Sequence, residues 1–252
     1  MKNSEIIQII NSLKKAYPDA TCSLDFSTPF ELVVAGMLSA QCTDERVNKT
    51  TPTLFSKCKS IQDYANIDIN ELENIIHPCG FYKNKARNIK LCANQILEKF
   101  NGEVPHTMEE LISLSGIGRK SANVIMLEAF NKPQGIAVDT HAKRISNRIG
   151  FSSESEPIKI EQDLLKLISN KYYKDLIRIF PKESLKDINH LLVWHGRNTC
   201  VSRSPKCQTC CINKFCKHYL ENSSIRFRVN SAIFSDSSVN VPSSFKIGVS
   251  SI

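Results

Sequence analysis

The sequence predicts an all-α protein, and two recurring patterns and one absence support this fold class. Hydroxyl and acidic side chains recur at the separation of a capping box, in which each satisfies a free backbone N–H at a helix start. Apolar residues recur every three or four positions, which gives a helix one apolar face. Alternating apolar and polar residues, the pattern of a strand, are scarce.

The predicted helices follow one another along the chain. The first has its apolar face within Ile6–Leu13, and the second starts at the capping box Thr28–Glu31, with proline at its first position. Ser60–Asp63 starts another helix, Ala86–Leu97 carries a long apolar face, and Thr107–Glu110 caps the helix after that. We therefore expect a chain of mostly short helices.

Size and charge narrow the class of protein. The chain has 252 residues and a formal net charge of +8, which either attracts a polyanion such as nucleic acid or is only a solvated basic surface. No apolar run approaches the roughly 18 to 20 residues that span a bilayer, and no export or transit pattern opens the sequence. We expect a folded cytoplasmic protein that is not in a membrane.

The composition changes at two places. Turn residues fill the segment Asn131–Gly135, which is a candidate crossing between two domains. From about residue 221 the chain turns to Ser, Asn and Val and loses its helical period, so we expect a poorly ordered tail with no assigned role.

Two glycines, Gly116 and Gly118, separate a helix that ends near Leu114 from the apolar helical run Ser121–Phe130. Glycine allows the positive φ of a tight hairpin and lets a phosphate approach the N–H groups at the start of the second helix. The pattern predicts either a helix-hairpin-helix that holds DNA or a simple turn between helices.

Lys120 stands at the start of that second helix, and Asp139 precedes the predicted helix Thr140–Ile149. The positive end of a helix disfavours an ammonium, which leaves more free amine to act as a nucleophile. A carboxylate opposite would accept a proton or stabilise positive charge. Alternatively, Lys120 contacts phosphate and Asp139 caps its helix, and for Asp139 both roles are compatible.

Ten cysteines in a chain without an export signal point away from disulfides. Zinc sites usually use two Cys-x2-Cys pairs, and this chain has only one, whereas iron–sulfur clusters tolerate irregular spacing. Cys211 is surplus to fourfold ligation. The four predicted cluster ligands are Cys200, Cys207, Cys210 and Cys216.

These segments, in this order, closely resemble the endonuclease III family, the iron–sulfur branch of the helix-hairpin-helix DNA glycosylases. The resemblance spans about residues 1 to 218. The matching motifs are Ser39–Gln41, Gly102–Pro105, Gly116–Lys120, Val138–His141, His195–Arg197 and the four cysteines.

The resemblance implies a specific architecture. A six-helix barrel would occupy residues 23–133, with the helix-hairpin-helix at about 107–130. Residues 1–22 and 134–218 would form the second domain, which carries a 4Fe-4S cluster. DNA would bind in the cleft between the domains, and residues 219–252 would form the tail.

The resemblance also implies roles for individual residues. Lys120 would be the catalytic nucleophile and Asp139 the essential carboxylate. Gln41 would fill the space left by the flipped nucleotide, and Phe81 would be an apolar wedge, although the adjacent Tyr82 offers a second aromatic and either could be core. The DNA-binding residues of the hairpin would be Gly116, Gly118 and Arg119.

The implied function is base-excision repair by a monomeric enzyme on double-stranded DNA. It would remove oxidised pyrimidines such as thymine glycol and cleave abasic sites by β-elimination through a lysine Schiff base. Adenine-mismatch glycosylases, which lack this lysine, resemble the chain less. A pyrimidine-dimer or mismatch glycosylase of the same fold, a non-catalytic iron–sulfur DNA-binding protein and an electron carrier are the alternatives.

Overall fold

In the computed structural model, which describes residues 1–169 and 184–223, every regular element is a helix, so the all-α prediction is confirmed. Short 3-10 turns occur at η1 (His77–Cys79), η2 (Cys207–Thr209) and η3 (Asn213–Phe215). The α-helices are α1 (Asn3–Ala16), α2 (Pro29–Leu38), α3 (Asp44–Lys57), α4 (Ile61–Asn66), α5 (Ile69–Ile76), α6 (Tyr82–Lys99), α7 (Met108–Ser113), α8 (Arg119–Glu128), α9 (Thr140–Ile149), α10 (Pro157–Ser169) and α12 (Ser184–Asn198).

The predicted caps start the helices as expected. At α2 the Thr28 hydroxyl accepts the backbone N–H of Glu31 at 3.2 Å, and the Glu31 carboxylate accepts that of Thr28 at 3.2 Å. Ser60 and Asp63 form the same reciprocal pair at α4. Thr107 accepts a backbone N–H at the start of α7. These local bonds satisfy donors that a helix start leaves free, and they explain why the helices begin at these residues.

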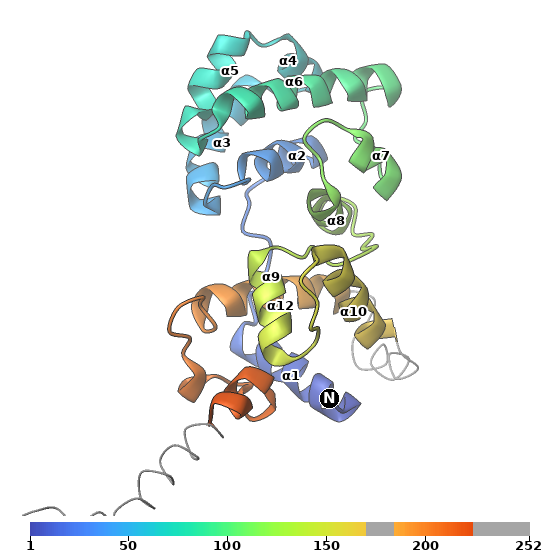
Figure 1. Cartoon of the computed structure of the whole chain (residues 1–252). Coiled ribbons are helices and arrows are strands. Elements are labelled where there is room, and N and C mark those ends of the chain that lie inside the picture. Colours follow the sequence, from blue (N-terminus) through green and yellow to red (C-terminus); the bar gives the residue numbers. More distant parts are fainter. Residues whose placement is uncertain (170–183, 224–252) are drawn as a thin grey trace, which may run out of the picture.

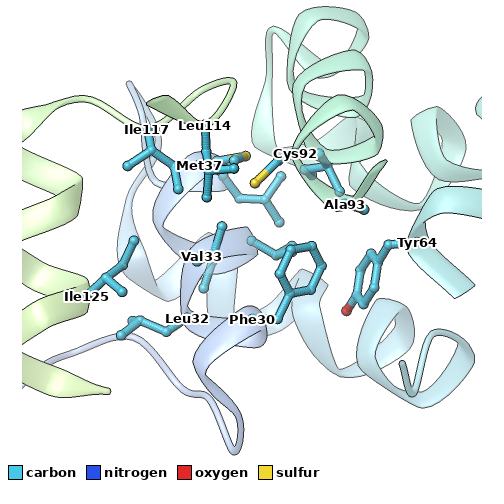
Figure 2. Close-up of a cluster of buried hydrophobic side chains, with 14 of the residues drawn as sticks. Phe30, Leu32, Val33, Met37, Tyr64, Cys92, Ala93, Leu114, Ile117 and Ile125 are labelled. Atoms are coloured by element: carbon cyan, nitrogen blue, oxygen red, sulfur yellow. The ribbon is translucent and has the colours of Figure 1, made fainter. Parts of the chain in front are cut away.

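One hydrophobic core joins helices α2 to α8 in the upper half of Figure 1. Its centre is aliphatic, with Leu32, Val34 and Leu38 of α2 fully buried. Phe30 and Tyr64 meet edge to face with ring centroids 5.0 Å apart (Figure 2). Each fully buried side chain of this size stabilises the fold by roughly 1.5–3 kcal/mol.

A second core lies below the first and combines both ends of the described chain (Figure 1). Ile9 of α1, Ile145 of α9 and Leu192 of α12 are almost completely buried in it. The chain therefore starts in the second core, passes through the first and returns after Gly135. The domain limits at residues 22–23 and 133–134 stay a prediction.

None of the described helices combines the length and the apolar content needed to cross a bilayer. Residues 217–223 form a further helix, so the helical part of the chain extends slightly into the segment predicted as a tail. The predicted tail beyond residue 223 lies outside the described residues.

Candidate active site

A cleft of about 680 Å³ lies where the two cores meet. Segment 21–24, which connects the two cores, lines it, and the first core contributes the loop 39–44 and helix α8. The second core contributes segment 137–143 and helix α12. This volume falls in the range of roughly 300–1,000 Å³ that is typical of small-molecule sites.

Three of the predicted site residues line this cleft, namely Gln41, Lys120 and Asp139. They come from three separate segments of the chain. The structure thus brings together the amine of Lys120, the carboxylate of Asp139 and the amide of Gln41. The remaining predicted DNA contacts do not line the cleft and are Phe81, Gly116, Gly118 and Arg119.

Lys120 is the second residue of α8, and its side chain is exposed at the cleft. Within residues 1–169 and 184–223, no hydrogen bond or ion pair engages its Nζ atom. The amine is consequently open to a ligand, as a nucleophile or a phosphate contact must be.

Asp139 is half-buried and forms the N-cap of α9, as one reading of the sequence predicts. Its Oδ1 atom accepts the backbone N–H of Ala142 at 2.7 Å. No hydrogen bond in the described part of the chain uses Oδ2. The cap holds the side chain in one orientation while the second oxygen stays available for chemistry.

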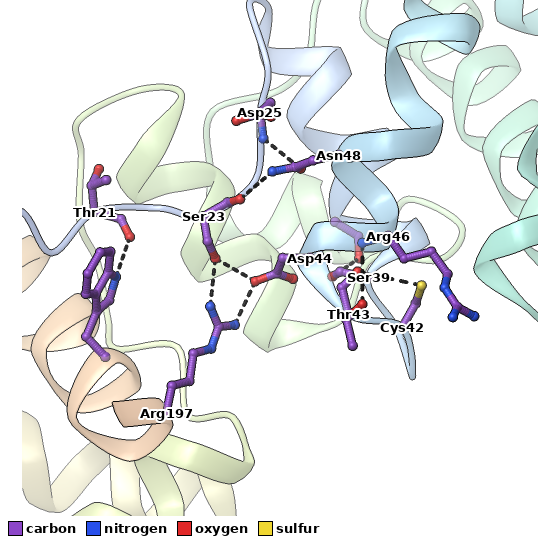
Figure 3. A network of polar contacts seen from close by, with 12 residues as sticks. Thr21, Ser23, Asp25, Ser39, Cys42, Thr43, Asp44, Arg46, Asn48 and Arg197 are labelled. Atoms are coloured by element: carbon purple, nitrogen blue, oxygen red, sulfur yellow. Dashed lines mark hydrogen bonds and ion pairs between the residues drawn. The ribbon is translucent and has the colours of Figure 1, made fainter. Parts of the chain in front are cut away.

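An ion pair that the sequence did not reveal spans the cleft (Figure 3). Asp44 at the start of α3 accepts from Arg197 of α12 at 2.6 Å and from Ser23 at 2.5 Å. Burial raises the pKa of the Asp44 carboxyl, but these two hydrogen bonds and the charges of Arg197 and Lys120 lower it below its ordinary value. Asp44 therefore stays ionised and links the two cores.

A second pair bridges the cores deeper in the cleft. The Nε2 atom of His190, in α12, lies 2.8 Å from Oε1 of Glu128, the last residue of α8. Both side chains are almost completely buried and both residues line the cleft. This contact ties the C-terminal end of the lysine-bearing helix to the second core.

The N-terminal half of α8 is tied to the second core as well. Glu161 of α10, which is 3% exposed, accepts from Arg119 at 2.7 Å and from Asn123 at 2.8 Å. These two partners flank Lys120 in the sequence. Arg119 is thus ion-paired within the protein, which makes holding α8 its visible role, while its predicted DNA contact stays a prediction.

The two hairpin glycines differ in what they provide. Gly116 has φ of +78°, and an added Cβ would lie 3.0 Å from Cβ of Asn88 and 3.2 Å from the sulfur of Met37. Gly118 has φ of −99°, with nothing within 4 Å of an added Cβ, and it is the N-cap of α8. Only Gly116 therefore needs the positive φ that the sequence predicted for this turn.

Gln41 and Phe81 lie on separate loops of the first core. Both are non-glycine residues in the left-handed backbone region, with φ of 54° and 49°. Phe81 is 65% exposed, whereas Tyr82 packs its ring on His77 with centroids 4.5 Å apart. Of the two adjacent aromatics, Phe81 is therefore the one that is not part of the core.

The four predicted cluster ligands all line one small cavity beside α12, although they come from different turns. Arg148 of α9 donates to the Sγ atom of Cys200 at 3.5 Å, and Nε2 of His195 lies 3.7 Å from that of Cys210. Cys211 is exposed and does not line the cavity. In the described ranges, no three His, Cys, Asp or Glu side chains are close enough to hold a single metal ion.

Comparisons with known proteins agree with this arrangement. Residues 34–170 match the family described as HhH-GPD superfamily base excision DNA repair protein. The chain is 45% identical to endonuclease III of Synechocystis sp., covering 85% of this chain and 93% of the relative. It is 37% identical to endonuclease III of Escherichia coli K12, covering 86% and 97%.

The fold also matches solved structures. One is a non-covalent endonuclease III–DNA complex, with a TM-score of 0.78, 38% identity and coverage of 89% of this chain and 99% of that chain. Another is a trapped endonuclease III–DNA covalent intermediate, with the same TM-score and identity and coverage of 88% and 99%. The chain belongs to the endonuclease III family.

Membership of the endonuclease III family makes the chain a DNA glycosylase and abasic-site lyase of base-excision repair, as its motifs predict. An iron–sulfur cluster is expected for this family. The Asp44–Arg197 and Glu161–Arg119 contacts were missed by the sequence analysis, because their partners are 153 and 42 residues apart and no local pattern pairs them.

We expect Gly135→Ala to weaken the contacts between Glu161 of the second core and helix α8, and so to lower the free energy of unfolding. A methyl group at this position would lie 2.0 Å from Oε1 of Glu161 and 2.7 Å from Oδ1 of Asn123, so these side chains must shift and their mutual contact is disturbed. Overpacking of this kind costs about 1–3 kcal/mol of unfolding free energy, which urea denaturation measures. Gly36→Ala is the matched control, because its added methyl meets nothing within 4 Å. Equal effects of the two substitutions would contradict the crowding at Gly135.

Proposed function

We propose that the chain removes oxidised pyrimidines such as thymine glycol from double-stranded DNA and then cleaves the resulting abasic site. One observation carries the proposal: the open amine of Lys120 and the oriented carboxylate of Asp139 line the same cleft. DNA binding alone requires neither group at that place. The covalent intermediate trapped for an endonuclease III of 38% identity supports a covalent step here too.

Contacts with the DNA backbone would come from the basic surface and from the hairpin before α8. The net charge of +8 favours phosphate binding. The bare backbone at Gly118 leaves open space at the helix start, where N–H groups favour an anion. These contacts hold DNA without reading its sequence.

The first step removes the base. The damaged nucleotide leaves the stack at a cost of a few kcal/mol, which is lower for a poorly stacked lesion, and enters the cleft. Gln41 fills the gap and Phe81 wedges the duplex. The lone pair of Lys120 then forms a bond to C1′, and the base departs with the electrons of the glycosidic bond.

The second step cleaves the strand. The nitrogen of Lys120 loses a proton, and its lone pair forms a double bond to C1′ as the C1′–O4′ bond breaks and O4′ takes up a proton. The positive charge of the resulting Schiff base acidifies the C2′ proton. Loss of that proton expels the 3′ phosphate by β-elimination. Oδ2 of Asp139 accepts a proton or stabilises the positive charge on the sugar, while Oδ1 keeps the side chain in place through the cap.

We further propose that Cys200, Cys207, Cys210 and Cys216 hold a 4Fe-4S cluster. Their convergence on one cavity fits a group bound by four thiolates. A zinc site fits the sequence less well, since zinc sites usually use two Cys-x2-Cys pairs and this chain has one. When bound, the cluster would brace its loop and supply no step of the reaction.

Borohydride trapping on abasic and thymine-glycol DNA tests the nucleophile. The wild-type protein should give a covalent cross-link, and Lys120→Ala should give none because the attacking amine is gone. Lys143→Ala is the matched control, since Lys143 lines the same cleft and should still cross-link. A panel that adds pyrimidine-dimer and mismatched substrates defines the lesion. Trapping by Lys120→Ala at the wild-type level would refute the assignment.

Asp139→Asn separates catalysis from capping. Asparagine caps a helix as well as aspartate does, so the melting temperature should stay close to that of the wild type. Loss of the carboxylate should lower the base-excision rate by roughly 10²–10⁴-fold, measured in single turnovers on thymine-glycol duplex. Asp139→Ala should lower both the rate and the stability. A normal rate for Asp139→Asn would mean that Asp139 only caps α9.

Metal analysis tests the cluster. Anaerobically purified protein should contain iron and sulfide and absorb visible light, and Cys207→Ser should lose both, because a ligand is removed. Cys211→Ser should keep them, since Cys211 is exposed and does not line the cavity. Stoichiometric zinc in a colourless wild-type protein would overturn the proposal.

A further inference from the structure

Lys85 of α6 is a buried lysine that the mechanism does not use. Its side chain is 6% exposed, and it does not line the cleft. Burial is the main cause that lowers the pKa of Lys85, and the nearby thiols of Cys42 and Cys79 oppose this effect. Burying an ammonium is costly unless strong acceptors surround it. The groups that accept hydrogen bonds from Lys85 therefore indicate why this lysine is buried.

Those partners are two backbone carbonyls. The Nζ atom donates to the carbonyl oxygen of Leu38 at 2.8 Å and to that of Cys79 at 3.0 Å. Leu38 is the last residue of α2, and Cys79 is the last residue of η1. Carbonyls at a helix end have no partner within the helix and attract a cation. One ammonium therefore caps the ends of two helical segments.

Each capped carbonyl lies two or three residues before a predicted DNA-probing residue. Leu38 is followed by the loop with Gln41, and Cys79 is followed by Gly80 and Phe81. Gln41 and Phe81 both have positive φ, which is unfavourable for residues with a Cβ and persists only where the surroundings impose it. Lys85 thus holds the backbone three residues before Gln41 and two residues before Phe81.

We infer that Lys85 is a positioning residue that ties the Gln41 loop to the Phe81 loop, so that both side chains enter the duplex as one rigid unit. The inference rests on the proposed function, in which Gln41 and Phe81 act while a nucleotide is extruded. It adds that extrusion depends on a buried cation outside the cleft. Chemistry at a sugar that is already unstacked does not depend on that cation.

This difference defines the experiment with Lys85→Met, which keeps the length and apolar stem of the side chain but loses both hydrogen bonds. We measure kcat/KM on a thymine-glycol duplex, and borohydride trapping on a single-stranded abasic oligonucleotide. Misplacement of the loops should lower kcat/KM on the duplex by about 100-fold. Trapping on the single strand should stay at the wild-type level, because Lys120 and Asp139 are untouched.

The same helix supplies a matched control. Lys90 of α6 donates to the carbonyls of Ala65 at 2.6 Å and Ile67 at 2.5 Å, where α4 leads into α5. This site lies away from both probing loops. Lys90→Met should cost stability through the same kind of lost contact, yet its ratio of duplex to single-strand activity should equal that of the wild type.

A second readout follows the loops themselves. In a duplex with a tetrahydrofuran abasic analogue opposite 2-aminopurine, binding of wild type and Lys90→Met should raise the fluorescence as the base is unstacked, and Lys85→Met should not. If Lys85→Met does not fold, Lys85→Gln, which retains one donor group, replaces it.

The outcomes separate two failures. A wild-type protein that neither traps nor cleaves would refute the proposed function. An active wild type with Lys85→Met equal to it on the duplex, or with duplex and single-strand activity falling equally, would overturn the positioning role.

Discussion

The active site depends on the polar bridges that hold helix α8 against the second core. Lys120 belongs to a helix of the first core, and Asp139 caps a helix of the second, so their separation is a property of neither core alone. Glu161 accepts hydrogen bonds from Arg119 and Asn123 near the start of α8. His190 contacts the last residue of this helix. Both contacts use a buried carboxylate, and removal of its partner would take away a contact that compensates its burial, which is strongly destabilising. They are suited to fixing a distance across an open cleft.

Helix ends recur as functional devices throughout the molecule. The N-terminal end of α8 places bare N–H groups beside open space at Gly118, and that of α9 fixes the orientation of Asp139. The C-terminal end of α2 is capped by Lys85 and the junction after α4 by Lys90. The free backbone groups at these helix ends thus orient an acid and hold two buried or half-buried lysines, and those at the start of α8 are suited to an anion.

Helix α12 connects the cysteine loop with the cleft. Its residue His195 is buried, with Nδ1 3.0 Å from the Tyr17 hydroxyl and Nε2 beside Cys210. Two residues later, Arg197 reaches Asp44 across the cleft. The loop that would hold the cluster therefore contacts the same helix that bridges the cores. A change in this loop could alter the position of Arg197 in the cleft through α12.

The features that could be predicted from the residues alone are local. The caps at Thr28 and Ser60 act over three residues, and the helical period and the cysteine spacing are likewise visible in short windows. They predicted the all-α class and the cysteine site, and the order of motifs predicted the family. Lys120 and Asp139 were named by resemblance, since spacing alone left phosphate binding and capping open.

Contacts between distant groups follow from the tertiary fold and could not be predicted. The Asp44–Arg197 bridge, the Glu161 contacts and the two carbonyls on Lys85 join residues whose pairing leaves no periodic trace. A backbone carbonyl as partner leaves no side-chain signature at all. The first two contacts form where the two cores face each other, and the Lys85 contacts form where α6 packs beside the ends of α2 and η1 within the first core.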